Sequence, residues 1–169
     1  MKLYIVGPVS RGKSTLAKKI SYKLNIPYHS LDEVVHIPDQ THPWGNRKRP
    51  PEERDILFYS IINQQQWIIE DVGRPIFEDG LGQADLIILL DTPARVRKYR
   101  IIKRWVRQRL GLEKCIYRPH FKMLRGMYQW SRNYDTGKDN LKERIIKYQE
   151  KIITLKRKKD IDLFLENIT

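Results

Sequence analysis

Gly7-Pro8-Val9-Ser10-Arg11-Gly12-Lys13-Ser14, followed by Thr15, carries the strongest structural signal in this sequence. The stretch fits the pattern G-x-x-x-x-G-K-[ST] at every position. An apolar run at residues 2–6 precedes it and predicts a short buried strand, and a helical pattern from Ser14 to Leu24 follows it. A strand, a glycine-rich turn and a helix in this order are typical of a loop that binds phosphate groups.

The chemistry of such a loop gives its residues definite roles. Glycines let the backbone turn tightly with its N–H groups pointing inward, and the helix N-terminus adds partial positive charge. Lys13 can then reach the β- and γ-phosphates of ATP, and Ser14 can ligate Mg²⁺. The predicted cofactors are therefore ATP and Mg²⁺, and the predicted nucleotide contacts are Gly7, Ser10, Arg11, Gly12, Lys13, Ser14 and Thr15. The alternative is an ordinary glycine turn capped by a serine, which the full match to the motif disfavours.

Length and composition predict one domain over residues 1–169. The chain is 40% hydrophobic, which is enough for a core of its own. No apolar run approaches the roughly 20 residues that span a bilayer, and the apolar start ends at Gly7-Pro8 without a cleavage-site pattern. The one cysteine, Cys115, has no internal disulfide partner, which suits a reducing compartment. We expect a soluble, cytoplasmic protein with no membrane partner.

The net charge of +13 lies in the second half of the chain. Residues 1–91 contain 11 Lys and Arg against 12 Asp and Glu, whereas residues 92–169 contain 22 against 8. A field of this sign favours an anionic partner, such as nucleotide phosphates or nucleic acid, although a solvated basic surface also satisfies it.

Acidic residues follow several of the predicted strands. The run at 26–31 leads to Asp32, the run at 67–69 leads to Glu70 and Asp71, and the run at 84–90 leads to Asp91. The last two runs are almost uniformly apolar, as in a parallel sheet whose two faces are covered by helices. Together with the runs at 2–6 and 152–155, they predict a three-layer α/β/α fold of the P-loop NTPase class with a mostly five-stranded parallel sheet. Ligands bind at the carboxyl edge of such a sheet.

These acids and a nearby arginine are candidate site residues at that edge. Asp32 can hydrogen-bond a substrate hydroxyl, accept its proton or help to hold the water of a metal ion; capping of the next helix is the alternative. Ser14, Glu70 and Asp71 are the candidate metal residues, because a carboxylate there can orient Mg²⁺ through water. Arg74 can grip a phosphate. The pattern does not separate Glu70 from Asp71.

Residues 32–66 are the predicted acceptor-binding insert. Four prolines and one glycine interrupt any period between residues 34 and 51, which predicts a mobile substrate loop. His36 and His42 lie in it without partners at a zinc-site spacing. A helix is predicted at 51–65, with proline and acids in its first turn. Arg54 on this helix is a candidate contact to a substrate phosphate, with a surface ion pair as the alternative.

The segment 94–110 predicts a helix with two stripes. Its apolar residues recur at spacings of three and four and predict a buried face, formed by Val96, Tyr99, Ile102, Val106 and Leu110. Arginines recur on an adjacent stripe, namely Arg97, Arg100, Arg104 and Arg107. The planar guanidinium suits phosphate better than an ammonium group does, which favours a phosphate cleft over a solvated or nucleic-acid-binding face.

Residues 95–138 are the predicted lid-like region. Arginines alternate with aromatic side chains in its second half, a mixture that can stack on and hold bases. A lid or peripheral helix that buries Phe121, Leu124 and Tyr128 is the favoured alternative. The rest of the chain predicts a helix at 140–151 with Arg144, a strand at 152–155, and a helix at 161–167 capped by Asp160.

With these residues placed, the chain resembles P-loop kinases of the adenylate-kinase-like group and, more closely, the bacterial DNA topology modulation proteins of the FlaR type. The resemblance spans nearly the whole chain. It rests on the order of the following pieces: residues 7–15, Leu31-Asp32, Trp67 to Glu70, Ala84 to Pro93, Arg97 to Arg104, and Leu110 to Lys114.

The resemblance implies roles for several arginines. The family has two lid-base arginines that touch the nucleotide phosphates, and they match Arg100 and Arg104; a third, in an R-x-x-x-Y helix, matches Arg144. The acid and the phosphate-gripping arginine of the family match Glu70 and Arg74, in a turn that here lacks the family's proline. Ser10 and Arg11 stand where adenylate kinases usually have glycine and a small residue, so an uncommon backbone geometry is expected at Ser10.

Two functions follow from these observations. The first is a kinase that transfers the γ-phosphoryl group of ATP to a small nucleotide-like or hydroxyl-bearing acceptor. Its predicted catalytic residues are Lys13, Arg100, Arg104, Arg144 and Asp32, and its predicted substrate contacts are Asp32, Arg54 and Arg74. The second is a nucleic-acid-binding regulator that uses the basic half, with the ATP site as a switch. A GTPase is disfavoured because no N-K-x-D motif follows a predicted strand.

Overall fold

The computed structural model describes residues 1–113, 115 and 117–168. A five-stranded sheet with the strand order β2-β5-β1-β6-β7 forms the centre of this part of the chain. All of its neighbouring strands pair in parallel, so the predicted parallel sheet is confirmed. Its strands are β1 (Lys2–Val6), β2 (Tyr28–Ser30), β5 (Trp67–Asp71), β6 (Leu86–Leu90) and β7 (Ile152–Leu155).

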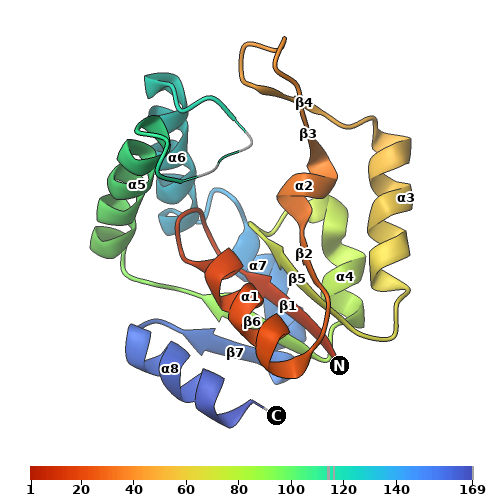
Figure 1. The fold of residues 1–169 in the computed structure, drawn as a ribbon. Helices are drawn as coiled ribbons and strands as arrows, with labels where there is room; N and C mark the ends of the chain where they lie inside the picture. Colours follow the sequence, from red (N-terminus) through yellow and green to blue (C-terminus); the bar gives the residue numbers. More distant parts are fainter. Residues whose placement is uncertain (114, 116, 169) are drawn as a thin grey trace.

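Helices cover both faces of the sheet and produce three layers (Figure 1). Alternate residues of a strand point to opposite faces, so Leu3 and Ile5 face one side and Tyr4 and Val6 face the other. The first side packs against α1 (Lys13–Leu24) and α8 (Lys158–Asn167). The second side packs against α2 (Leu31–Val35), α3 (Pro51–Ile62), α4 (Glu78–Gln83) and α7 (Leu141–Ile145). This double cover explains why every residue of β5 is buried.

The strand register aligns the strand ends that position the site. Ser30 of β2 pairs with Glu70 of β5, and Asp71 pairs with Val6 of β1. Val6 is the last residue before the glycine-rich loop. The loop, Ser30, Glu70 and Asp71 therefore lie at one edge of the sheet.

Two arms rise beside that edge (Figure 1). One arm consists of α5 (Ala94–Arg109) and α6 (Phe121–Asp135). The other consists of α2 and an antiparallel hairpin of β3 (His36–Pro38) and β4 (Asn46–Lys48). The backbone amide of Arg118, between α5 and α6, donates to the carbonyl of Trp44 in the hairpin at 2.7 Å. The two arms are thus joined.

The hairpin corrects the expectation of an irregular segment at 34–51. Each of its strands has three residues, and none of the six is fully buried. A strand that short and exposed leaves no apolar alternation in the sequence. The prolines that interrupt the period lie at the end of β3, in the turn and after β4, so they are compatible with the hairpin.

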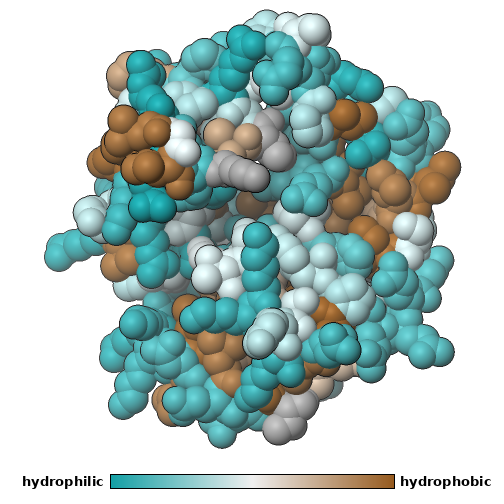
Figure 2. Space-filling view, in the orientation of Figure 1, coloured by the Kyte–Doolittle hydropathy of each residue, from teal (hydrophilic) through white to brown (hydrophobic). Residues whose placement is uncertain are grey.

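Helix α5 lies where the sequence predicts it but buries a different face. The five apolar residues of the expected stripe are exposed, from 38% at Val96 to 67% at Leu110, and Figure 2 shows apolar side chains on the surface over this arm. The buried residues are Arg97, Ile101, Trp105 and Gln108. Arg97 and Gln108 obtain hydrogen-bond partners within the arm, and a buried polar residue with a partner cannot be recognised from apolar periodicity.

Helix α6 likewise buries another face than predicted. Its buried residues are Met127, Ser131 and Tyr134 rather than Phe121, Leu124 and Tyr128. Phe121 is 68% exposed although its ring centroid lies 4.9 Å from that of Trp105. The aromatic residue at the start of α6 therefore covers the end of α5 from the solvent side.

The remaining elements differ from prediction mainly at their ends. Helix α3 ends at Ile62, and α7 continues as a 3₁₀ helix, η2 (Ile146–Lys151). Helix α8 begins at Lys158, and the carboxylate of Asp160 accepts from the amides of Lys156 and Arg157 at 2.9 and 2.8 Å. The 3₁₀ helix η1 (Pro75–Phe77) and α4 were not predicted, because glycines at two of the six α4 positions weaken its helical signal. Within the described ranges, no helix has the length and apolar character needed to cross a membrane.

Candidate active site

The glycine-rich loop between β1 and α1 has the backbone that its sequence requires. Gly7 has φ 148°, and a Cβ there would lie 2.6 Å from the carbonyl oxygen of Leu90, so the close approach of the loop to β6 needs glycine. Gly12 has φ 86° and opens α1. Ser10 has φ 58°, which is the uncommon geometry expected for it.

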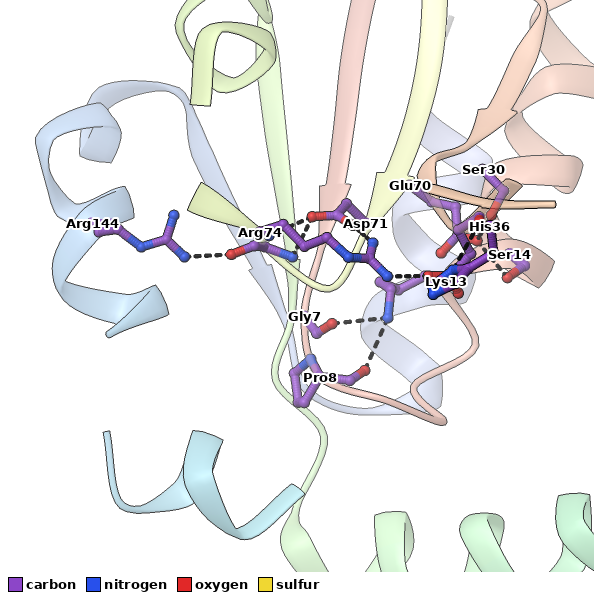
Figure 3. Close-up of polar contacts among 12 residues, drawn as sticks. Gly7, Pro8, Lys13, Ser14, Ser30, His36, Glu70, Asp71, Arg74 and Arg144 are labelled. Carbon is purple, nitrogen blue, oxygen red and sulfur yellow. Dashed lines mark hydrogen bonds and ion pairs between the residues drawn. The ribbon is translucent and has the colours of Figure 1, made fainter. Parts of the chain in front are cut away.

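Lys13 extends from the first residue of α1 back over the loop (Figure 3). Its ammonium group donates to the carbonyls of Gly7 and Pro8 at 2.8 and 3.0 Å. Burial lowers the pKa of Lys13, and the nearby carboxylates of Glu70 and Asp32 oppose that shift. The lysine thus lies in the field of both acids and over the mouth of the loop.

Glu70 is the acid that contacts the loop. Its Oε1 accepts from the hydroxyls of Ser14 and Ser30, each at 2.9 Å, and from the hydroxyl of Tyr28 at 3.4 Å. The side chain is held at this position because Ser30 is its partner in the strand register. Ser14 and Glu70 therefore offer two adjacent oxygen ligands beside the loop, the ligand type that Mg²⁺ prefers.

Asp71 has a different set of partners, although it adjoins Glu70. It is 2% exposed and accepts from the backbone amides of Gly73 and Arg74 at 2.7 and 2.5 Å. Its other oxygen forms an ion pair with the guanidinium of Arg74. Asp71 thereby fixes the turn after β5 and the direction of the Arg74 side chain.

Arg74 connects the turn after β5 to the arm that contains α2 and the hairpin, and Figure 3 shows its side chain reaching from that turn. Its second guanidinium nitrogen forms an ion pair with Asp32, in the first turn of α2. Burial raises the pKa of Asp32, but the Arg74 charge and hydrogen bond outweigh burial, so the net pKa is lowered. The N-cap position of α2 belongs to Ser30, not to Asp32.

The arginines expected around the phosphates lie in three places. Arg144 of α7 donates to the carbonyl of Gly73, next to Arg74. Arg100 donates to the carbonyl of Arg11 at 3.2 Å, so its guanidinium lies against the loop. Arg104 is half exposed and pairs with Glu113 at 3.2 Å.

Three of the expected arginine contacts point elsewhere. The side chain of Arg11 is 1% exposed and turns away from the loop, toward Asp91 and Thr92. Arg97 is equally buried and pairs with Asp135. Arg54 pairs with Asp55, the next residue of α3, at 2.7 Å, which is the surface ion pair named as the alternative. Thr15 lies on the exposed side of the first turn of α1.

Ser30 and Tyr28 are site residues that sequence reasoning missed. Both lie on β2 and donate to Glu70. The available signal was the hydroxyl at the end of a strand two residues before Asp32, but only the register of β2 against β5 shows which acid it meets.

The residues at this edge fit a nucleoside triphosphate with Mg²⁺. The hydroxyl of Ser10 is buried in the loop with no hydrogen-bond partner among the described residues, and a phosphate oxygen is an acceptor that would satisfy it. No group of three His, Cys, Asp or Glu in the described part of the chain could hold a metal by itself. A metal held by Ser14 and Glu70 would thus depend on phosphate oxygens, as Mg²⁺ sites for nucleotides do.

Comparison with known proteins finds similarity only in three-dimensional structure. No family model and no curated protein matches the sequence. A shikimate kinase from Acinetobacter baumannii, in complex with shikimate, has a TM-score of 0.58 and 18% identity, over 97% of this chain and 88% of that one. A sugar kinase from Janibacter has a TM-score of 0.55 and 15% identity, over 97% and 89%. A shikimate kinase from Aquifex aeolicus has 0.54 and 17%, over 98% and 92%. The chain has the three-layer α/β/α fold of P-loop kinases.

Proposed function

We propose that the protein is an ATP- and Mg²⁺-dependent kinase that phosphorylates a hydroxyl group of a small anionic acceptor. One observation carries this proposal: the loop with Lys13, the Ser14–Glu70 pair and the Asp32–Arg74 pair share one edge of the sheet. This arrangement supports a phosphate-donor site beside a carboxylate that would act on an acceptor. Phosphoryl transfer needs positioning and charge neutralisation above all, and this edge offers both.

On the donor side, the loop amides and Lys13 would hold the β- and γ-phosphates. Ser14 and Glu70 would hold Mg²⁺, which supplies charge neutralisation between the phosphates. Arg100, placed against the loop by its bond to the Arg11 carbonyl, would stabilise the transferring group. Arg104 would join it on release from Glu113, and Arg144 would act from the Gly73 side.

On the acceptor side, Asp32 would orient an acceptor hydroxyl and accept its proton. Arg74 pairs with Asp32, and Arg144 lies at the Gly73 carbonyl, next to Arg74; both would attract an acceptor that carries a negative charge. The region 32–66 would enclose the acceptor, and the region 95–138 would close over the nucleotide. Kinases named for shikimate and for a sugar are among the structures of similar fold, which supports a small hydroxylated acceptor.

A panel of acceptors tests this proposal, with ADP release and the phosphorylated product measured together. Hydroxy acids, sugars and sugar acids form one arm of the panel, and nucleoside monophosphates form the other. We expect turnover with an acidic hydroxyl compound and a loss of about 100-fold or more in Asp32→Asn, from removal of the general base. Turnover with nucleoside monophosphates alone, or full activity of Asp32→Asn, would contradict the hydroxyl acceptor.

A nucleic-acid-binding regulator is the second candidate function. Residues 95–138 hold 14 Lys and Arg against two acids. Both acids already have partners, because Glu113 pairs with Arg104 and Arg107 and Asp135 pairs with Arg97. The affinity for a duplex bound there would fall steeply as the salt concentration rises, since each neutralised phosphate releases counterions. Titration of a DNA duplex at several salt concentrations checks this; absent or salt-insensitive binding would leave only the kinase.

A further inference from the structure

The side chain of Arg11 lies inside the protein although its backbone is part of the phosphate loop. It is 1% exposed, and one guanidinium nitrogen donates to the carbonyl of Thr92. The other lies 3.4 Å from a carboxylate oxygen of Asp91. Its Cζ lies 5.5 Å from the ring centroid of Tyr134. A buried guanidinium needs such partners, because an unpaired buried charge is costly.

Arg97 of α5 meets the same partners from the other side. It donates to the same Thr92 carbonyl at 3.1 Å, and its Cζ is also 5.5 Å from the centroid of Tyr134. It donates further to Ser131 at 2.8 Å and forms an ion pair with Asp135. Two guanidinium groups thus share one carbonyl and one aromatic ring. Burial, followed by the charge of Arg97, lowers the pKa of Arg11 to about 10.

Acidic and aromatic groups hold this cluster together. The hydroxyl of Tyr134 donates to Asp91 at 2.9 Å, and the ammonium of Lys142 lies 3.3 Å from the same carboxylate. The cluster therefore joins four segments: the phosphate loop, the turn from β6 to α5, α6, and α7, which carries Lys142. Among the members of this cluster, Arg11 is the residue that belongs to the phosphate loop.

Arg11 also has a backbone contact to α5. Its carbonyl oxygen accepts from a guanidinium nitrogen of Arg100 at 3.2 Å. Its side chain is fixed just before α5 begins, and its carbonyl is fixed two turns into that helix. The loop is thus attached both to the turn before α5 and to α5 itself, and both attachments pass through one residue.

We propose that Arg11 is a positioning residue that sets the place of Arg100 relative to Lys13, and that its side chain contacts no phosphate. The inference rests on the proposed function, since Arg100 and Lys13 act there on the same transferring group. Loss of the guanidinium would free the loop from the turn at 91–93 and let Arg100 and Lys13 move apart. Displacements of about 1 Å can reduce a rate by about 100-fold.

The test compares Arg11→Met, which keeps much of the volume, with Arg109→Met as the matched control. Arg109 also packs on aromatic rings, with its Cζ 5.4 Å from the centroids of Trp105 and Phe121, but it is the last residue of α5, whereas the loop contacts lie before and near the start of that helix. We expect kcat to fall about 100-fold in Arg11→Met, with a smaller change in KM for ATP. The control is expected to keep the wild-type kcat.

The double variant Arg11→Met with Arg100→Met separates positioning from a merely structural role. If Arg11 acts through Arg100, the double variant is no slower than Arg100→Met alone, because the two losses do not add. Losses that multiply, or a wild-type kcat in folded Arg11→Met, would overturn the proposal. If Arg11→Met does not fold, Arg11→Lys replaces it, with the same expected non-additivity and a smaller loss.

Amide hydrogen exchange gives a readout that does not need turnover. We expect faster exchange in Arg11→Met at both residues 7–14 and residues 91–100, and no change there in Arg109→Met. Unchanged exchange in both segments would overturn the attachment of the loop through Arg11. A wild-type protein that transfers no phosphoryl group would contradict the kinase, while this exchange measurement would still decide whether Arg11 holds the loop.

Discussion

At the scale of single residues, the two neighbouring acids at the end of β5 have separate tasks. Glu70 accepts from Ser14 and Ser30, whereas Asp71 holds the turn with Gly73 and Arg74. Adjacent residues of a strand point to opposite faces, so both cannot face the loop. Under the proposed function, Glu70 would therefore hold the metal, while Asp71 fixes the geometry of Arg74.

The first prediction concerns these two acids. In Glu70→Gln, the Mg²⁺ concentration for half-maximal activity should rise about 10- to 100-fold, as is usual when a group that holds or orients a metal is lost. In Asp71→Asn, the Mg²⁺ dependence should stay unchanged, while the free energy of unfolding should fall by about 3 kcal/mol because the buried partner of Arg74 is weakened. Activity against Mg²⁺ and urea unfolding measure the two effects; equal Mg²⁺ effects would contradict the division.

The second prediction concerns the pKa of Asp32. Since this pKa is lowered in the folded chain by Arg74, the stabilisation from the ion pair is complete above the unfolded pKa of 3.8 and is lost as the pH falls through the folded value. In Arg74→Met, burial acts without the compensating charge, so the pKa of Asp32 should rise. Titration of the carboxyl carbon by ¹³C NMR checks the direction.

Asp39 is the control for that titration. The pKa of Asp39 is lowered by hydrogen bonds that its carboxylate accepts from Thr41. Both residues lie in the turn of the hairpin, and neither bond involves Arg74. The Asp39 titration should be the same in wild type and Arg74→Met. An Asp32 titration that does not move would show that Arg74 is not its partner.

At the scale of elements, α5 shows how far sequence patterns reach. The helix itself is predictable from its length and periodicity, and Pro93 marks its start. Its buried face is not, because Arg97 and Gln108 are buried through hydrogen bonds to Ser131 of α6 and to Tyr117 in the connection between the two helices. The hairpin is hidden for a related reason: its short strands leave no apolar alternation, and the bonds of Arg49 to α2 and of Arg118 to Trp44 form only in the folded chain.

The third prediction uses neighbouring isoleucines of α5. Ile101 is fully buried and Ile102 is 49% exposed. Ile101→Asp should lower the free energy of unfolding by about 3 kcal/mol or more, since it buries an unpaired carboxylate. Ile102→Asp should change it by no more than about 0.5 kcal/mol. Urea unfolding of the two variants decides between the faces; a larger loss for Ile102→Asp would restore the face expected from apolar periodicity.

At the scale of the whole molecule, the sheet can be predicted from the sequence. The contacts that join the edge of the sheet to the two arms cannot. Strands β1, β5 and β6 are readable because helices cover both faces and leave apolar runs. The positions of Lys13 and Ser14 are also predictable, because the loop motif fixes their spacing from its glycines. The unconstrained positions of that motif say nothing of where a side chain points, so the inward turn of Arg11 follows only from its contacts with Thr92 and with Tyr134 of α6.

The phosphorus NMR spectrum of ATP incubated with the protein, Mg²⁺ and an acidic hydroxyl acceptor tests the central claim most directly. We expect loss of the γ-phosphate resonance and growth of a phosphate-ester resonance, with both abolished in Lys13→Ala while the variant keeps the wild-type fold. An unchanged γ-phosphate resonance across the acceptor panel, a product that is only inorganic phosphate, or equal turnover by Lys13→Ala would contradict a kinase built on this loop.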